Sequence, residues 1–252
     1  MEVAARVGLS ARGVIYLMIG ALILALSFGH KRSETDQRGA MQEIAAQSGG
    51  AVLILAIAVG LVGYALWRYA EAAFGAADGG KKAGPRLKSL GRALAYTSLA
   101  SSAFAVFAGR HKSQAKESGD LSATVMAHPG GRVLVAVVGV VLMVLGIALV
   151  AEGVRRKFEK HLQRGAMSQT ARKVVIPLGV VGTTARGAVF TLVGVLTIDA
   201  AVRFDPDKAS GIDAVVRTLA GQPFGRLLLV VTALGLLAFG AYGLAEARWA
   251  KT

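Results

Sequence analysis

Charged residues at matched positions in three parts of the chain could form ion pairs. Three arginines begin apolar stretches, and three glutamates end later ones. These residues are Arg12, Arg92 and Arg186, and Glu71, Glu152 and Glu246. The successive arginine and glutamate lie 59, 60 and 60 residues apart. Because a planar guanidinium can hold a carboxylate through two hydrogen bonds, the chemistry that these residues predict is ion pairing.

The position of these charges beside apolar segments indicates that each needs a partner. A charge near the hydrocarbon of a bilayer is costly and usually faces other protein groups. An arginine at a helix start and a glutamate at a helix end also oppose the helix dipole. We therefore expect structural clasps, formed within one helical hairpin or between neighbouring hairpins. The alternatives are a polar ring that gates or lines a path, and simple extension of the side chains to the membrane interface.

No other reactive chemistry is indicated. The chain contains no cysteine, which excludes disulfides, thiolate nucleophiles and cysteine metal sites. It contains no phosphate-binding loop, no serine-hydrolase elbow and no zinc-protease motif, and its four histidines are scattered. We expect no catalytic, cofactor-binding or metal-binding residues, and we expect that the protein is not an enzyme.

The elements that must position these charges are long apolar segments. Hydrophobic residues make up 54% of the 252-residue chain and charged residues only 17%. The apolar residues cluster in six runs, each close to the ~20 residues that a helix needs to cross a bilayer. The runs cover residues 13–29, 51–70, 93–109, 133–151, 174–202 and 224–245. They predict an all-α integral membrane protein with six transmembrane helices.

The distribution of basic residues predicts the orientation in the membrane. The net charge of +14 could indicate nucleic-acid binding, but the basic residues are concentrated in the 71–92 and 152–175 loops. With the termini and these loops on one side, that side holds 18 Lys and Arg against 6 Asp and Glu, and the other holds 11 against 9. Basic loops stay in the cytoplasm. We expect cytoplasmic termini, anionic headgroups beside the basic loops, and no nucleic-acid partner.

Several features recur in register in three parts of the chain. An aromatic residue follows each arginine by four positions, as Tyr16, Tyr96 and Phe190. Small residues recur seven apart, as Gly13 and Gly20 in the first copy. These matches define repeats 6–72, 87–153 and 179–247, joined by basic linkers 73–90 and 154–175, within a single membrane domain 1–252. Each repeat is expected to form a two-helix hairpin, and the three are expected to share a pseudo-threefold axis along the membrane normal.

The repeat pattern resembles a bacterial membrane family known as the domain-of-unknown-function 1206 family. The resemblance is carried by Ala11–Tyr16, Gly63–Ala72, Ala185–Phe190 and Tyr242–Ala247. They match an ARG-x-x-Y-type start and a GYxLWR-x-x-EA-type end. The middle copy departs from the start pattern, and the second and third copies lack the Trp and Arg of the first. The resemblance covers nearly the whole chain and implies three tandem two-helix units in a bacterial inner membrane, but no activity.

Two features of the fifth apolar run allow alternative interpretations. Asp199 is the one acid inside an apolar run, and it could pair with Arg203 one helical turn later. It could instead mark a cation or proton path, as acids within membranes often do. The segment 174–185, which contains Pro177, could form a short interfacial helix or extend the helix that follows.

The sequence leaves two classes of function open. The first is a bundle that binds a small solute, ion or lipid, or lets one permeate along the pseudo-threefold axis. The second is a structural or partner-binding membrane protein without transport activity, which is favoured by the concentration of ionisable residues at the ends of the runs. A water-accessible axis lined by small and polar faces would support the first class, and an axis filled with aliphatic side chains would count against permeation.

Overall fold

The computed structural model describes residues 2–29, 41–42, 44–47, 49–75, 83–109, 114–209 and 211–249. These residues form helices, turns and connecting segments, and no β-strand is found among them. The long helices are α1 (Glu2–Ser27), α3 (Gly50–Phe74), α4 (Ala83–Phe107), α6 (Gly131–Val154), α7 (Gln169–Arg203) and α9 (Gly225–Trp249). The short ones are α5 (Gln114–Met126), α8 (Ile212–Ala220) and the 3-10 helices Lys157–His161, Arg164–Ala166 and Pro206–Ala209.

Four of the described helices, α3, α6, α7 and α9, are long and apolar enough to cross a membrane. A shorter apolar helical segment, Arg12–Ser27, forms most of α1. Helix α4 contains all but the last two residues of the predicted run 93–109, and it is less apolar because it begins with a basic segment and includes several serines. The all-helical class is therefore confirmed for the described residues, and four of the six expected spans have the length and apolar composition of a membrane helix, while the other two remain predictions.

Helix α7 decides between the two interpretations of the segment 174–185. The segment belongs to one continuous helix of 35 residues, with Pro177 near its start. At 1.5 Å per residue this helix is about 52 Å long, well beyond a ~30 Å hydrocarbon core. Ser168 caps it by accepting a hydrogen bond from the backbone nitrogen of Ala171. The segment thus extends the helix that follows it.

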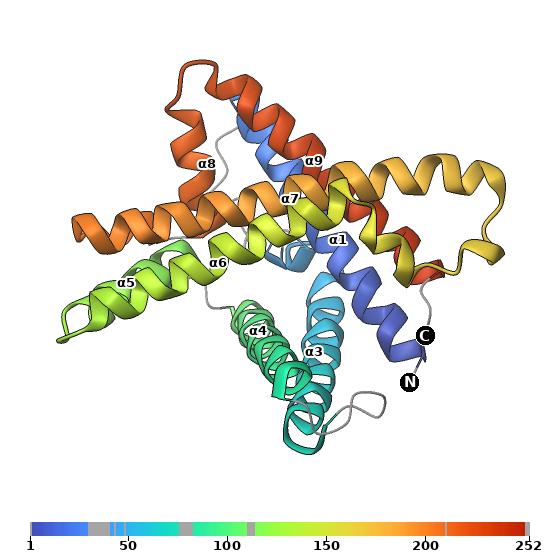
Figure 1. Ribbon diagram of the computed structural model, residues 1–252, viewed down its shortest axis with the longest axis horizontal. Helices are drawn as coiled ribbons and strands as arrows, with labels where there is room; N and C mark the ends of the chain where they lie inside the picture. Colours follow the sequence, from blue (N-terminus) through green and yellow to red (C-terminus); the bar gives the residue numbers. More distant parts are fainter. Residues whose placement is uncertain are drawn as a thin grey trace. The chain divides into compact units, whose positions relative to one another are not determined.

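The chain forms two compact units, and each is described by itself. The first unit comprises residues 1–11 and 41–111 and is built on α3 and α4, which lie side by side (Figure 1). Its two helices meet through small buried residues spaced seven apart, Ala58 and Ala65 on α3 and Ala93 and Ala100 on α4. Small side chains allow helix backbones to approach closely.

The second unit comprises residues 12–40 and 112–252 and is organised around α7. Helix α7 lies along α6 for most of its length (Figure 1) and also packs against α9. Glycines of α6 and α7 face each other directly. A Cβ atom added to Gly146 would lie 2.7 Å from the carbonyl oxygen of Gly187, and one added to Gly187 would lie 2.8 Å from that of Gly146. The two backbones therefore leave no space for side chains at this crossing.

The same reciprocal glycine contact joins α1 to α9 within the second unit. A Cβ atom on Gly13 would lie 2.9 Å from the Gly240 oxygen, and one on Gly240 would lie 2.8 Å from the Gly13 oxygen. By the repeat register, Gly13 corresponds to Gly187 and Gly240 to Gly146. Each contact thus joins the last helix of one repeat to the first helix of another. Packing within a repeat, which the expected hairpins require, is seen for α7 and α9.

The even-numbered apolar runs begin with a shared turn. A residue with positive φ is followed by a glycine that starts the helix, as in Gly49–Gly50, Gly130–Gly131 and Phe224–Gly225. The backbone nitrogen of the second residue donates to a carbonyl three residues back, at 2.8–3.0 Å. A Cβ atom on Gly131 would lie 1.7 Å from the Val125 oxygen, so only glycine fits there. Helices α5 and α8 precede two of these turns, in segments that the sequence presented as loops.

The third copy of this turn places Phe224 at φ 62°, where the other copies have glycine. A left-handed backbone costs a non-glycine residue about 1–2 kcal/mol, and the Phe224 side chain is 82% exposed. We expect Phe224→Gly to raise the free energy of unfolding by about 0.5 kcal/mol, since the strain relief exceeds the added freedom of the unfolded chain. Thermal unfolding in detergent measures this change. Gly130→Ala should lower stability by about 1 kcal/mol, and a loss of stability for Phe224→Gly would contradict the strain.

Candidate functional site

The first element of the candidate site is an ion pair between distant parts of the second unit. Nη2 of Arg12 donates to Oε2 of Glu246 at 2.5 Å. The side chains are 27% and 14% exposed, so the pair is largely removed from solvent. It joins the first helix of the first repeat to the last helix of the third. Among the residues that the structure describes, no atom accepts a hydrogen bond from the buried Nε of Arg12.

The second element is Arg186, which is enclosed by aromatic rings. Its Nε donates to the hydroxyl oxygen of Tyr16 at 3.0 Å. Its guanidinium carbon lies 4.8 Å from the ring centre of Phe239, 5.2 Å from that of Phe190 and 5.4 Å from that of Tyr16. Within the described part of the chain, Arg186 has no ion-pair partner. The negative faces of the rings stabilise this half-buried cation by about 0.5–2 kcal/mol each.

The ring of Phe239 connects the two arginines. The guanidinium of Arg12 lies 5.3 Å from the centre of this ring, and Tyr16 packs edge-on against it at 4.8 Å. Tyr16 and Phe239 are each 3% exposed. We call Arg12, Tyr16, Arg186, Phe190, Phe239 and Glu246 the arginine–aromatic cluster. It combines two guanidinium groups with one carboxylate, and therefore carries a net positive charge.

Buried hydroxyl groups next to the cluster lack protein partners. Tyr242 is 2% exposed, and its ring packs against Phe158 at 5.2 Å. The hydroxyls of Tyr242 and Thr184 have no hydrogen-bond partner among the described residues. Leaving a buried polar group unpaired costs about 1–3 kcal/mol, so such groups are usually satisfied by water or a ligand. At this end of the second unit, the hydroxyls of Tyr242 and Thr184 are therefore available to a water molecule or a ligand.

In the first unit, the equivalent glutamate and its neighbours have hydrogen-bond partners within that unit. Glu71 accepts hydrogen bonds from Nη1 of Arg68 at 2.5 Å and from the Ser89 hydroxyl at 3.2 Å. Arg68 also donates to the Tyr64 hydroxyl and stacks on the rings of Tyr64 and Trp67. The Arg that distinguishes the first copy thus supplies a partner for its glutamate from the same helix, and the Trp stacks on that Arg.

The remaining members of the expected clasps are placed without a described ion pair. Arg92 is exposed on α4 in the first unit. Glu152 is half-buried on α6 in the second unit, near enough to the Tyr242 hydroxyl to influence it electrostatically. Because the expected pairs Arg12 with Glu71 and Arg92 with Glu152 join different units, they remain predictions. Arg186 and Glu246 belong to the same unit but make no ion pair with each other.

Asp199 lies in a small charge network at the C-terminal end of α7. Its two carboxylate oxygens accept hydrogen bonds from Nε of Arg203 and Nζ of Lys208, both at 2.6 Å. The side chains of Asp199, Arg203 and Lys208 are 31%, 69% and 35% exposed. Exposed pairs of this kind contribute about 0–1 kcal/mol. Sequence reasoning missed Lys208, which reaches Asp199 only because a 3-10 helix folds back after α7.

Two further arginines near this end were also missed. Arg132, the second residue of α6, donates to the backbone oxygens of Ala201 and Val202, the last acceptors of α7. Arg226, the second residue of α9, stacks on the ring of Phe28 at 4.9 Å. The sequence feature that could have identified these two arginines is their equivalent position in the repeats, one residue after the turn glycine.

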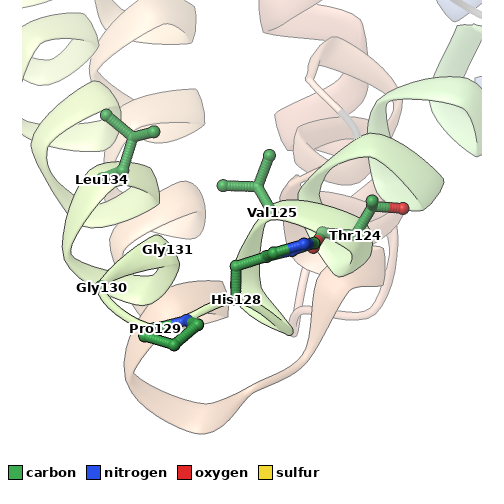
Figure 2. Close-up of a pocket in the computed structure, with 7 residues that line it drawn as sticks. All are labelled: Thr124, Val125, His128, Pro129, Gly130, Gly131 and Leu134. Carbon is green, nitrogen blue, oxygen red and sulfur yellow. The ribbon is translucent and has the colours of Figure 1, made fainter.

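The structure also contains a shallow pocket at the turn between α5 and α6. Figure 2 shows His128, Pro129 and Leu134 among the residues around it. The ring nitrogen Nδ1 of His128 is hydrogen-bonded to the Thr124 backbone oxygen at 2.9 Å, and His128 is exposed. The pocket is mostly apolar and open, without convergent polar groups. No cluster of three or more His, Asp or Glu side chains suited to a metal occurs in the described ranges.

The apolar helices and the internal repetition define a multi-pass membrane protein built from tandem repeats. Of the residues expected to form clasps, only the glutamates lie near helix ends. The expectation that the arginines begin their helices is wrong, because α1, α4 and α7 begin 10, 9 and 17 residues before Arg12, Arg92 and Arg186. The chain belongs to the family described as Domain of Unknown Function (DUF1206), whose model matches residues 7–75, 87–156 and 181–250. This confirms the family and the three tandem repeats that the sequence predicted.

One bacterial relative extends the match along the chain. The Uncharacterized protein YxxB of Bacillus subtilis (strain 168) is 30% identical over 242 residues, which cover 95% of this chain and 87% of the relative. No solved structure gives a significant match to the chain.

Proposed function

We propose that this protein binds a small polar solute or a lipid headgroup at the arginine–aromatic cluster, and that it neither catalyses a reaction nor forms a permeation path. The observation that carries the proposal is the environment of Arg186. This half-buried cation is held by Tyr16 and three aromatic rings, and no ion-pair partner lies among the described residues. A cation fixed in this way is prepared for a partner from outside the chain.

The packing of the small residues argues against permeation. A path lined by the small faces of the first helices of the repeats would need those faces to be free. Gly13 and Gly20 instead lie against α9, and Gly187 and Gly194 lie against α6. The fully buried aliphatic side chains of α1, such as Ile19, fill space between helices.

The proposal includes a placement in the membrane. We propose six membrane-spanning helices in a bacterial inner membrane, with both termini and the basic linkers in the cytoplasm next to anionic headgroups. The excess of Lys and Arg in these segments supports this orientation. We also propose that the three repeats are related by a threefold axis along the membrane normal. The equivalent glycine contacts of α6 with α7 and of α9 with α1 support this relation.

Binding and permeation can be separated with the purified full chain. Liposomes containing the protein should release ions and small solutes no faster than empty liposomes do. In detergent, a panel of neutral, cationic and anionic solutes and lipids should contain at least one ligand that raises the unfolding temperature. At a concentration ~100 times its Kd, a ligand adds about 2.7 kcal/mol to the free energy of unfolding.

Variants locate the binding site. Arg186→Ala should abolish the stabilisation by the ligand, whereas Arg203→Ala, which removes an exposed arginine outside the cluster, should retain it. Flux above that of empty liposomes would overturn the exclusion of permeation. Failure of the whole panel to stabilise the protein would instead favour the alternative, a structural or partner-binding membrane protein.

A further inference from the structure

We propose that the ligand of the arginine–aromatic cluster carries a phosphate group, which Arg186 holds with its two terminal nitrogens. This inference rests on the proposed binding function and names its ligand class. The phosphate could belong to a phospholipid headgroup or to a free phosphate or phosphorylated solute, because both present the same oxygens to the site.

The hydrogen bonding of Arg186 leaves the required edge of the guanidinium available. Its Nε is used by the Tyr16 hydroxyl oxygen, at 3.0 Å. Within the described residues, Nη1 and Nη2 have no acceptor. These two nitrogens form a planar fork that matches two oxygens of a phosphate. Tyr16 accepts the bond from Arg186, so its own hydroxyl proton can be donated to a third oxygen.

The charge of the cluster favours an anion of low charge. Arg12 and Arg186 both lie against the ring of Phe239, while Glu246 neutralises one of them through its bond to Arg12. The remaining positive charge matches the single negative charge of a phosphodiester. The rings around Arg186 restrict its movement, which reduces the entropy lost when a ligand binds.

The segment after α6 brings basic residues to the end of the second unit that holds the cluster. The segment after α6 docks on this end of the second unit: Phe158 is buried against Tyr242, and the Gln163 nitrogen donates to the Trp249 oxygen at 2.8 Å. The side chains of Arg155, Arg156, Lys157 and Lys160 in this part of the chain are exposed, whereas those of Glu152 and Glu159 are half-buried, so the exposed charge is positive. Exposed basic residues attract the anionic phosphates of a membrane surface or a solute.

The test measures the affinity of named probes for the full chain in detergent. The probes are inorganic phosphate, the soluble lipid dihexanoyl phosphatidylglycerol, and acetate as a carboxylate control, at matched ionic strength. We expect at least one phosphate-containing probe to bind and acetate to bind at least about tenfold more weakly. Arg186→Gln should weaken phosphate binding by about tenfold or more, the loss expected for hydrogen bonds to a charged group. Arg186→Lys should recover only part of it, because lysine lacks the fork.

Glu246→Gln provides a variant whose effect has the opposite sign. Removing this carboxylate frees Arg12 and raises the positive charge of the cluster, so phosphate should bind several-fold more tightly to the folded variant. A purely structural role for the cluster predicts no such gain. Arg203→Gln is the matched control and should leave the affinity unchanged.

The outcomes distinguish the two sources of the phosphate. They also distinguish a failure of the phosphate assignment from a failure of the binding function. Tighter binding of dihexanoyl phosphatidylglycerol than of inorganic phosphate identifies a lipid headgroup as the ligand, and the reverse identifies a soluble phosphate. If acetate or an uncharged solute binds in an Arg186-dependent manner and phosphate probes do not, the phosphate assignment is overturned and the binding function stands. If no phosphate-containing probe binds to a folded protein, the phosphate assignment is overturned, and the binding function is overturned as well if the panel of solutes and lipids also fails to stabilise the protein.

Discussion

Gly146→Ala is expected to lower the free energy of unfolding by about 2 kcal/mol. The added Cβ atom would lie 2.4 Å from the backbone nitrogen and hydroxyl oxygen of Thr191 and 2.7 Å from the Gly187 oxygen. Two of these three atoms belong to the backbone of α7, so the helices must move apart. Overpacking of this kind typically costs about 1–3 kcal/mol, and alanine's higher helix propensity returns less than 1 kcal/mol. Chemical or thermal unfolding in detergent measures the loss.

A matched substitution on another helix isolates the effect of the close contact. A Cβ atom on Gly60, in the middle of α3, would meet no heavy atom within 4 Å. Gly60→Ala should therefore be neutral or stabilise the protein by up to about 1 kcal/mol. Gly240→Ala, at the equivalent position against α1, should resemble Gly146→Ala. Equal losses at Gly60 and Gly146 would show that the α6–α7 contact is not the cause.

The second large effect concerns the ion pair between Arg12 and Glu246. Glu246→Ala should cost about 3 kcal/mol, because it leaves a largely buried guanidinium without its carboxylate. Arg12→Ala should cost a similar amount, and the double variant little more than either single one. We expect a coupling energy of about 2 kcal/mol in the double-mutant cycle. Unfolding of all four proteins in the same detergent provides the measurement.

Two further double-mutant cycles serve as comparisons for the coupling energy of Arg12 and Glu246. Asp199 and Arg203 form a more exposed pair, and their coupling should be about 0.5 kcal/mol or less. Arg186 and Glu246 make no ion pair, so their cycle should show weaker coupling than that of Arg12 and Glu246. Strong coupling in the Arg186 cycle together with additive losses in the Arg12 cycle would mean that the clasp forms within the third repeat.

Much of the architecture was accessible from the sequence because its signals are local. A membrane helix needs about 20 consecutive apolar residues, and such runs are visible without knowledge of their neighbours. The spacing of the tandem repeats alone shows that Arg12 and Arg186 occupy equivalent positions. Helices α5 and α8 were missed because α5 is polar and α8 is an amphipathic helix of only nine residues, so neither carries a long apolar run. Helix α4 is less apolar than the membrane span that we expected, because its serines and its basic start lower its hydropathy. Its small residues nevertheless repeat in register.

The sequence by itself determined the repeats, the family, the apolar helices and the glutamates near the ends of three of them, but it placed the three arginines at helix starts, whereas they lie inside longer helices. Only the tertiary structure decided that Glu246 pairs with Arg12, and that Arg186 lies among the rings of Tyr16, Phe190 and Phe239. The helical period identifies the face on which a residue lies, but not the helix that covers that face. That choice depends on which backbones can approach closely, and here paired glycines on different repeats bring α1 against α9 and α6 against α7.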